Sequence, residues 1–512
     1  MGPLVAAAGL IVAVPAAALD KATCDGPADV EALEAGQWCE VPGSHLAAPG
    51  VRPDPVPAGS QAQGVIAAWS GGAYDRKRDR LIVWGGGHMD YAGNEVYVFD
   101  LGTLRWSRAS DPARNTGGNE PSGYYPSDDG TEPVDPRQPR ARHTYNYVQY
   151  LDSLDRFCSL GGAALYPSGQ TGTAHVDCFD FEARRWQALA DTPSQGIGAK
   201  SAYDCRTGHV WIQGTVAQYG LSELDPAANR WTQRLPNDED FRYSYGQTAD
   251  IDPAARRMVA VGEKKVVVWN LADPTKVTRQ YPALHGDVEI LARPAPGLAY
   301  DFHARALVAW AGGTEVFTVE ADEANAVVTR RPAAASNRVP ATALSAAANG
   351  TFGRFRYVPS RNVFIVVNAI DANVFLYRYT AGAGAPADCQ SGTAPPPVTP
   401  PPPGVDAGID SGAAGAGSDS GPASDAAPPI GGTPTADAGV AATGKNGCGC
   451  TLGGRASGGL AVVLTLTLGL GFVRRLLRRR RRPGWSRSPS EIGEVRRPHP
   501  SPLRKRRGSR SA

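Results

Sequence analysis

The chain has 512 residues, with 60 Gly and 43 Pro, and this composition indicates turn-rich β structure and low-complexity segments rather than one helical core. The net charge of +2 hides an asymmetry, because residues 474–512 hold 15 Lys and Arg against 2 Glu, which leaves the preceding part acidic. An acidic body lacks the basic face that nucleic-acid binding requires, so this class of function is excluded.

Residues 1–18 are predicted to be a secretory signal peptide. The stretch 4–18 is apolar and ends in Ala16, Ala17 and Ala18, the small residues that a signal peptidase reads, although no positive residue precedes it. An exported chain is expected to form disulfides among its eight cysteines. None of them has the C-x-x-C spacing that is typical of zinc or redox sites.

Residues 19–385 contain six copies of an internal repeat, spaced about 48 to 76 residues apart. The copies align on Tyr74, Tyr150, Tyr203, Ile251, Tyr300 and Tyr357. Each copy is predicted to be a four-stranded meander, which in the first copy has strands at 65–74, 80–84 and 95–100 and a fourth that opens at Trp106. The fold class is therefore all-β, and the architecture is a six-bladed β-propeller.

The sixth copy supplies only three strands, at 353–358, 363–368 and 373–379. An isolated strand pattern near the N-terminus, at 36–42, contains Trp38 in the position that Trp106 holds in the first copy. We expect this N-terminal strand to complete the last blade, because closing the ring removes two exposed sheet edges.

The cysteines fit this register. Cys158 and Cys178 fall on neighbouring antiparallel strands of the second copy, where a cross-strand disulfide is geometrically feasible. Cys39 could bond either Cys24 or Cys389 and so fasten the closing strand, and the sequence does not decide between them.

The C-terminal part changes composition. Residues 386–446 are rich in Pro, Gly, Ala and Asp and are predicted to be a disordered linker. Residues 447–482 combine an apolar run at 458–473, which we expect to enter the membrane, with an arginine cluster that marks the cytoplasmic side. Residues 483–512 form a basic, disordered tail.

The six-fold register, the Gly85-Gly86-Gly87 turn and the strand tryptophans resemble kelch-type, galactose-oxidase-like propellers, a fold that hosts many unrelated activities. The segments 84–97 and 353–359 are similar to parts of bacterial secreted kelch proteins. The tail resembles the Myxo-CTERM sorting signal, although such signals usually stop soon after the arginine cluster. That resemblance implies cleavage near Cys448 or Cys450 by a sorting protease, and a location at the cell surface or outer membrane.

A first candidate site is the segment 88–95 in the first copy. His88 could act as a base or metal ligand, Tyr91 as an acid or ligand contact, and Asp90, Asn94 and Glu95 could offer oxygen atoms to Ca²⁺. The favoured interpretation is a well-packed loop, because the spacing matches no established calcium or zinc pattern. No cofactor is expected, and Ca²⁺ is the alternative.

A second candidate site lies where inner strands approach the central channel. Its residues are Arg142, His143 and Tyr145 in the second copy, Tyr243 and Tyr245 in the fourth, and Arg354 and Arg356 in the sixth. Arginine could hold the carboxylate of an acidic sugar, and aromatic rings could stack on the sugar. Hydrogen bonding between blades is an equally good explanation of these residues.

Two functions follow. In the first, the propeller is a binding module for an extracellular glycan or protein. In the alternative, it is a lyase for acidic polysaccharide, with His88 or His143 as base, Tyr145 or Tyr91 as acid, and Arg142 or Arg354 neutralising a carboxylate. A copper oxidase is third, because its additional C-terminal ligand domain is replaced here by linker.

Overall fold

The computed structural model describes residues 20–57, 62–87, 90–113, 138–163, 172–194, 197–215 and 218–389, all within one compact unit. The predicted signal peptide, nearly all of the linker, the membrane segment 458–473, Cys448, Cys450 and the basic tail lie outside the described residues. Within the described ranges, no helix combines the length and apolar character needed to cross a membrane.

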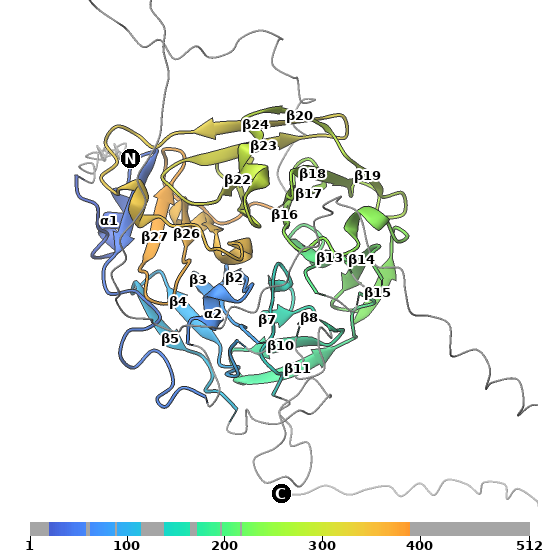
Figure 1. Cartoon of the computed structure of the whole chain (residues 1–512), viewed down its shortest axis with the longest axis horizontal. Coiled ribbons are helices and arrows are strands. Elements are labelled where there is room, and N and C mark those ends of the chain that lie inside the picture. Colours follow the sequence, from blue (N-terminus) through green and yellow to red (C-terminus); the bar gives the residue numbers. More distant parts are fainter. Residues whose placement is uncertain are drawn as a thin grey trace, which may run out of the picture. The chain divides into compact units, whose positions relative to one another are not determined.

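Six antiparallel four-stranded units make up the described part of the chain (Figure 1). From the inner to the outer strand, blade one consists of β2 (Gly72–Asp75), β3 (Arg80–Val83), β4 (Tyr97–Asp100) and β5 (Arg105–Arg108). Blade two consists of β6 (Val148–Leu151), β7 (Arg156–Ser159), β10 (Val176–Asp180) and β11 (Arg185–Leu189). Blade three consists of β12 (Lys200–Asp204), β13 (His209–Gln213), β14 (Leu221–Asp225) and β15 (Arg230–Gln233). Blade four consists of β16 (Thr248–Asp252), β17 (Arg257–Gly262), β18 (Lys265–Asn270) and β19 (Thr278–Gln280). Blade five consists of β21 (Gly297–Asp301), β22 (Ala306–Trp310), β23 (Val316–Ala321) and β24 (Asn325–Arg331). Blade six consists of β25 (Arg356–Val358), β26 (Val363–Val366), β27 (Val374–Arg378) and β1 (Gln37–Val41).

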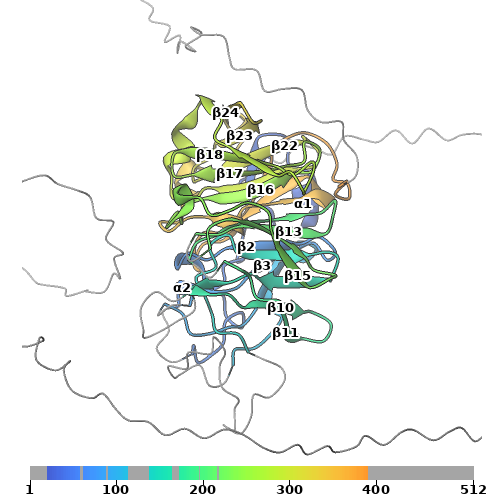
Figure 2. The ribbon, with the colours of Figure 1, turned by 90° about the vertical axis from the view of Figure 1, so that its right-hand side faces the viewer.

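The blades form a closed ring. The inner strands β2, β6, β12, β16, β21 and β25 contact one another in this order, and β25 contacts β2 again. Figure 2 shows the ring from the side, with strands crossing its thickness. The inner strands therefore line a central channel, and the predicted six-bladed propeller is confirmed.

Short elements decorate this ring. β20 (Ala283–Gly286) adds a parallel strand to β24, and β8 (Gly162–Ala163) pairs with β9 (Gly172–Thr173) beside blade two. The helices are short. α1 (Pro27–Glu31) precedes β1, and the others lie between strands: α2 (Gly64–Ala67) and the 3-10 turns η1 (Glu239–Phe241), η2 (Val288–Ala292), η3 (Ala341–Ala343), η4 (Phe352–Arg354) and η5 (Pro359–Arg361).

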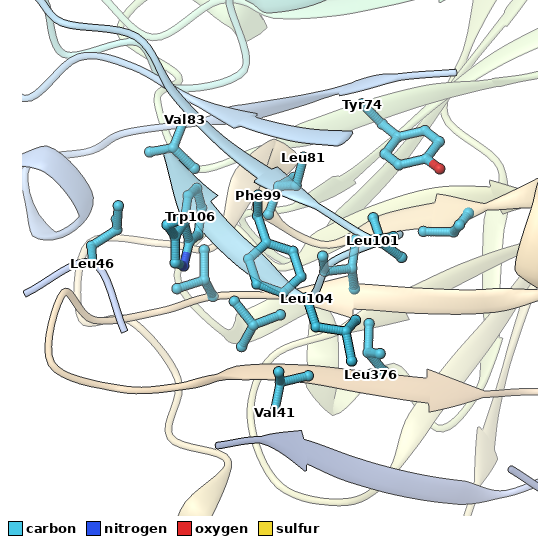
Figure 3. Packing of buried hydrophobic residues seen from close by; sticks show 14 of the residues in the cluster. Val41, Leu46, Tyr74, Leu81, Val83, Phe99, Leu101, Leu104, Trp106 and Leu376 are labelled. Carbon is cyan, nitrogen blue, oxygen red and sulfur yellow. The ribbon is translucent and has the colours of Figure 1, made fainter. Parts of the chain in front are cut away.

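The N-terminal strand closes the last blade, as the sequence predicts. β1 pairs antiparallel with β27, and Trp38 stands opposite Tyr377. The Trp38 indole is buried and donates to the carbonyl of Thr314 in blade five at 2.9 Å. Figure 3 shows Val41 of β1 and Leu376 of β27 in the same hydrophobic cluster as Phe99, Leu101 and Trp106 of blade one, so the closing strand also supports the junction between blades six and one.

In three blades, the tyrosine on which the repeat aligns bonds a residue of the turn that follows the inner strand: Tyr74, Tyr150 and Tyr357. The Tyr74 hydroxyl donates to Asp79 at 2.8 Å, and the Tyr357 hydroxyl donates to Asn362 at 2.8 Å. Both acceptors have a left-handed backbone, with φ of 50° and 49°. In these three blades the repeat thus reflects a turn in which the tyrosine side chain bonds the residue five positions later.

One predicted strand is wrong over half of its length. The segment 65–74 was expected to be the inner strand of blade one, whereas the structure has α2 at Gly64–Ala67 and begins β2 at Gly72. Trp69 between them has a φ of 48°, which is incompatible with an extended strand. At Gly71 a β-carbon would lie 2.2 Å from the Tyr145 carbonyl, so the close approach of blade two also requires glycine there.

Three disulfides join described cysteines. Cys158–Cys178 crosses β7 and β10 of blade two as predicted, and Cys24 is the partner that the structure gives to Cys39. Cys205–Cys389 ties the segment that follows blade six back to blade three. Disulfides of this number indicate an exported protein.

Candidate functional site

One face of the ring carries a row of residues with unusual backbone conformation. Just before its inner strand, every blade has a residue in the left-handed region, with φ between 31° and 79°: Trp69, Tyr145, Gly198, Tyr243, Ala295 and Phe352. Four of these six are aromatic. Bulky residues rarely adopt a positive φ, and such strain is concentrated at functional sites.

The rings on this face form a connected series that we call the aromatic arc, defined as Trp69, His143, Tyr145, Tyr245 and Tyr243. The centroids of successive rings lie 4.9, 6.1, 6.2 and 6.4 Å apart, within the usual range for aromatic pairs. The arc therefore joins blades one, two and four at the start of their inner strands.

Exposure differs along the aromatic arc. Tyr145 is buried and packs edge-on against Phe352 at 5.7 Å, whereas Trp69 and Tyr245 are half-buried and Tyr243 is 59% exposed. Large exposed hydrophobic side chains are few among the described residues, and Tyr243 is the most exposed of them. The arc thus has a fixed interior and an accessible end.

His143 is held by a carboxylate. Its Nε2 lies 2.7 Å from Oδ2 of Asp90, whose side chain is 30% exposed, and the imidazole itself is buried. A carboxylate partner fixes the orientation of an imidazole. Of the predicted candidates, the structure therefore brings together His143, Asp90 and Tyr145; His88 lies outside the described residues.

A buried lysine holds the segment that carries Tyr243 and Tyr245. Lys200 is fully buried, and its amine donates to the carbonyl and the hydroxyl of Ser244 at 2.6 and 2.7 Å. Ser244 in turn donates to Glu263, which also accepts the N–H of Gly246 at 2.7 Å. Burial lowers the pKa of Lys200 from 10.5 to about 7.

The predicted ligand-binding arginines are occupied by the protein itself. Arg142 is buried, forms an ion pair with Asp177 and donates to the His175 carbonyl at 2.9 Å. Arg354 donates to backbone carbonyls that include Val367 at 2.9 Å, and Arg356 donates to the carbonyls of Gly72 and Gly353. These contacts match the hydrogen-bonding explanation given for these residues above, and none of them reaches the aromatic arc.

The segment from Asp90 to Glu95 is well packed. The hydroxyls of Tyr91 and Tyr97 both donate to Glu95, and burial raises the pKa of Tyr91. Asn94 donates to the Pro139 carbonyl at 3.0 Å and accepts the N–H of Ala113 at 2.8 Å. Within the described ranges, no group of three or more His, Cys, Asp or Glu side chains is placed to hold a metal ion.

Sequence reasoning missed Trp69, Lys200 and Phe352. The signal that could have found the two aromatic residues is their position, a few residues before each aligned inner strand. The signal for Lys200 is a lone charge in the otherwise small and neutral run 199–202. A charged residue in an inner strand must be bonded within the fold.

Comparison with known proteins adds little to this geometry. No protein-family model matches the sequence, and no curated protein matches it. Among solved structures, the chain is similar to a novel fungal alcohol oxidase of the AA5 family in complex with copper, with 15% identity and a TM-score of 0.34. The alignment covers 54% of this chain and 56% of the oxidase, so the chain spans about half the length of that protein.

Proposed function

We propose that the propeller is a carbohydrate-binding module of the cell surface, and that the aromatic arc is its binding site. The observation that carries this proposal is the row of left-handed residues at the entries to the inner strands, four of which are aromatic. Export is supported by the three disulfides, and anchoring by the resemblance of the tail to a sorting signal.

The chemistry of the aromatic arc suits a sugar. The half-exposed rings of Trp69, Tyr245 and Tyr243 offer flat apolar surfaces for the C–H face of a pyranose, and tyrosine hydroxyls supply polar contacts. Asp90, 30% exposed beside His143, adds an acceptor for sugar hydroxyls. The rings are held by packing and by the Lys200 contacts, so little conformational entropy is lost on binding.

Retention on a panel of immobilised neutral and acidic polysaccharides tests this proposal. The full chain is expected to be retained on at least one glycan, and Tyr243→Ala to weaken that retention about tenfold, since a buried aromatic contact contributes roughly 1–2 kcal/mol. Tyr281→Ala is the matched control, because Tyr281 is 43% exposed and lies outside the aromatic arc. Equal retention of both variants, or no retention of the native chain, would contradict the proposal.

A polysaccharide lyase is the second candidate, and the His143–Asp90 pair is the observation that favours it. A carboxylate-oriented imidazole can remove a proton, and Tyr145, whose ring lies 6.1 Å from that of His143, could return one to the leaving oxygen. Following the absorbance of unsaturated uronates tests this candidate. A rise that His143→Ala abolishes would support the lyase, and a flat trace with every acidic glycan would rule it out.

A further inference from the structure

A cavity opens on the face of the ring that carries the aromatic arc. It lies between the segment 343–349, which leads into the inner strand of blade six, and the segment 366–375, which joins β26 to β27. Its volume is about 280 Å³, just below the roughly 300–1,000 Å³ of typical small-molecule pockets. Alanine is its most frequent lining residue, so we call it the alanine pocket. The pocket therefore suits a substituent of a sugar rather than a whole chain.

The walls of the alanine pocket are mostly apolar. Trp310, Val366 and Phe375, which are at most 6% exposed, form its buried side. The Trp310 indole N–H is already used, because it donates to the Gly313 carbonyl at 2.8 Å. None of the described residues that line the pocket has a charged side chain. A carboxylate, sulfate or ammonium substituent would lose its hydration there without gaining an opposite charge, so the walls select a neutral group.

The segment 343–349 is held from three sides. Gly313 of blade five donates its N–H to one carbonyl of the segment at 2.7 Å, and the Asn368 amide of blade six donates to another at 3.0 Å. On the third side, the Asn349 amide donates to the Ala67 carbonyl of α2 at 2.8 Å. The pocket is therefore formed before a ligand arrives, which reduces the entropy lost on binding.

The alanine pocket adjoins the Trp69 end of the aromatic arc. Ala67 lines the pocket, and its carbonyl accepts both the Asn349 amide and, at 3.1 Å, the N–H of Trp69. The Trp69 side chain is half-buried, so part of its ring is open to a ligand. A sugar stacked on Trp69 thus has a substituent within reach of the pocket.

Two polar side chains of the lining suit an amide. The Asn349 side chain is oriented by its bond to Ala67, and its Oδ1 accepts no bond from the described part of the chain. Ser345 is exposed, and its hydroxyl likewise bonds no described residue. An acetamido group offers an N–H to the Asn349 oxygen, a carbonyl to the Ser345 hydroxyl and a methyl to the apolar walls.

We propose that the alanine pocket receives the acetamido group of a sugar that stacks on Trp69, so that the ligand class is a neutral glycan containing N-acetylated amino sugars. This inference rests on the proposed binding of a glycan by the aromatic arc and names its chemistry. The arc supplies the surface on which the sugar rings stack, and the pocket supplies the selection among neutral glycans.

Glycans compared in matched pairs test the proposal. The members of a pair share one chain and differ only in whether a sugar carries an acetamido group or a hydroxyl at the same carbon. The full chain should bind the acetamido member at least about tenfold more tightly, as expected for a methyl-bearing group in an apolar pocket. Equal affinities within the pairs would overturn this inference and leave glycan binding intact, whereas no binding to any glycan would refute both.

Three variants locate the selection. Ala348→Phe fills the pocket from an exposed position of its lining, and it should lose the acetamido preference while it keeps its affinity for the hydroxyl member. Ala227→Phe, at an exposed turn between β14 and β15, is the matched control and should keep the preference. Tyr243→Ala, at the far end of the arc, should weaken both members by the same factor. An acetamido preference that survives in Ala348→Phe would place the group outside the pocket and contradict the proposal.

Saturation-transfer NMR on the native chain gives a result that does not depend on any variant. The acetyl methyl protons of a bound glycan should receive the strongest saturation, because the pocket surrounds them with protein protons. Stronger saturation of the sugar ring protons than of the methyl protons would overturn the proposal.

Discussion

Lys200 shows how a single residue can be both a structural clamp and a source of pH dependence. Its amine joins blade three to the Tyr243–Gly246 segment of blade four, and the Glu263 carboxylate completes the cluster. Burial lowers the pKa of Lys200 to about 7, so the unfolded chain binds this proton more tightly than the folded one. The residue thus opposes folding at neutral pH while it positions the exposed end of the aromatic arc.

The free energy of unfolding should therefore depend on pH through this residue. Between pH 7 and about 10 the unfolded state holds the proton and the folded state does not, so stability rises with pH, by at most about 1.4 kcal/mol per unit. The free energy of unfolding of the native chain minus that of Lys200→Met, measured by urea unfolding, should rise over this window and stay constant below it. A difference that is flat from pH 7 to 10 would contradict this assignment, and Lys276→Met, 82% exposed at its side chain, is the control.

The buried ion pair between Arg142 and Asp177 is a second residue-scale case. Both side chains are at most 1% exposed, so removing one charge leaves the other unpaired in the interior. Asp177→Asn should lower the free energy of unfolding by about 3–5 kcal/mol. Arg330→Gln, which breaks pairs with Glu289 and Glu315 at an exposed position, should cost under about 1 kcal/mol in the same urea experiment. Similar losses in the two variants would count against this reading.

At the scale of elements, the closing strand β1 connects the start of the propeller to its end. Without β1, the edge of β27 would be left with unpaired backbone groups, which invite association with other chains. Cys24–Cys39 additionally fixes β1 to the segment that precedes it.

Deletion of residues 20–41 should therefore increase the association of the chain over that of the native protein, as judged by size-exclusion chromatography with light scattering. A synthetic peptide of residues 20–41 should restore the native mass by pairing with β27. A truncated chain that keeps the native mass and unfolds as cooperatively as the native one would show that closure by β1 is dispensable.

The strands of the blades could be predicted from the sequence more accurately than the contacts of the candidate site residues. The repeat of Tyr74 and its equivalents and the Trp38 strand are local patterns, so the blades and their closure could be inferred from sequence. The structural role of Arg142 could not be assigned in this way, because its partner Asp177 lies 35 residues away, on β10 of the same blade. Trp69 was misread as part of a strand because its left-handed backbone depends on packing between blades rather than on local preference.

At the scale of the whole molecule, a disulfide at Cys389, the last described residue, joins the segment after blade six to blade three. Cys389 bonds Cys205 across 184 residues of sequence, and on the way the Ala385 N–H donates to the Pro359 carbonyl at 2.9 Å. Since a cross-link removes chain entropy from the unfolded state, replacing both cysteines by alanine should lower the free energy of unfolding by up to about 5 kcal/mol. Urea unfolding of that double variant checks this value, and an unchanged midpoint would mean that the cross-link does not restrain the unfolded chain.

On our proposal, the aromatic arc on one face of the ring recognises a glycan. Hydroxyl-radical footprinting of the full chain, with and without the polysaccharide that retains it, measures the solvent exposure of individual aromatic side chains. We expect protection of Trp69, Tyr243 and Tyr245, with Tyr281 on the outer part of blade four unchanged. Protection of Tyr281 without protection of the arc, or of no described aromatic residue, would contradict it.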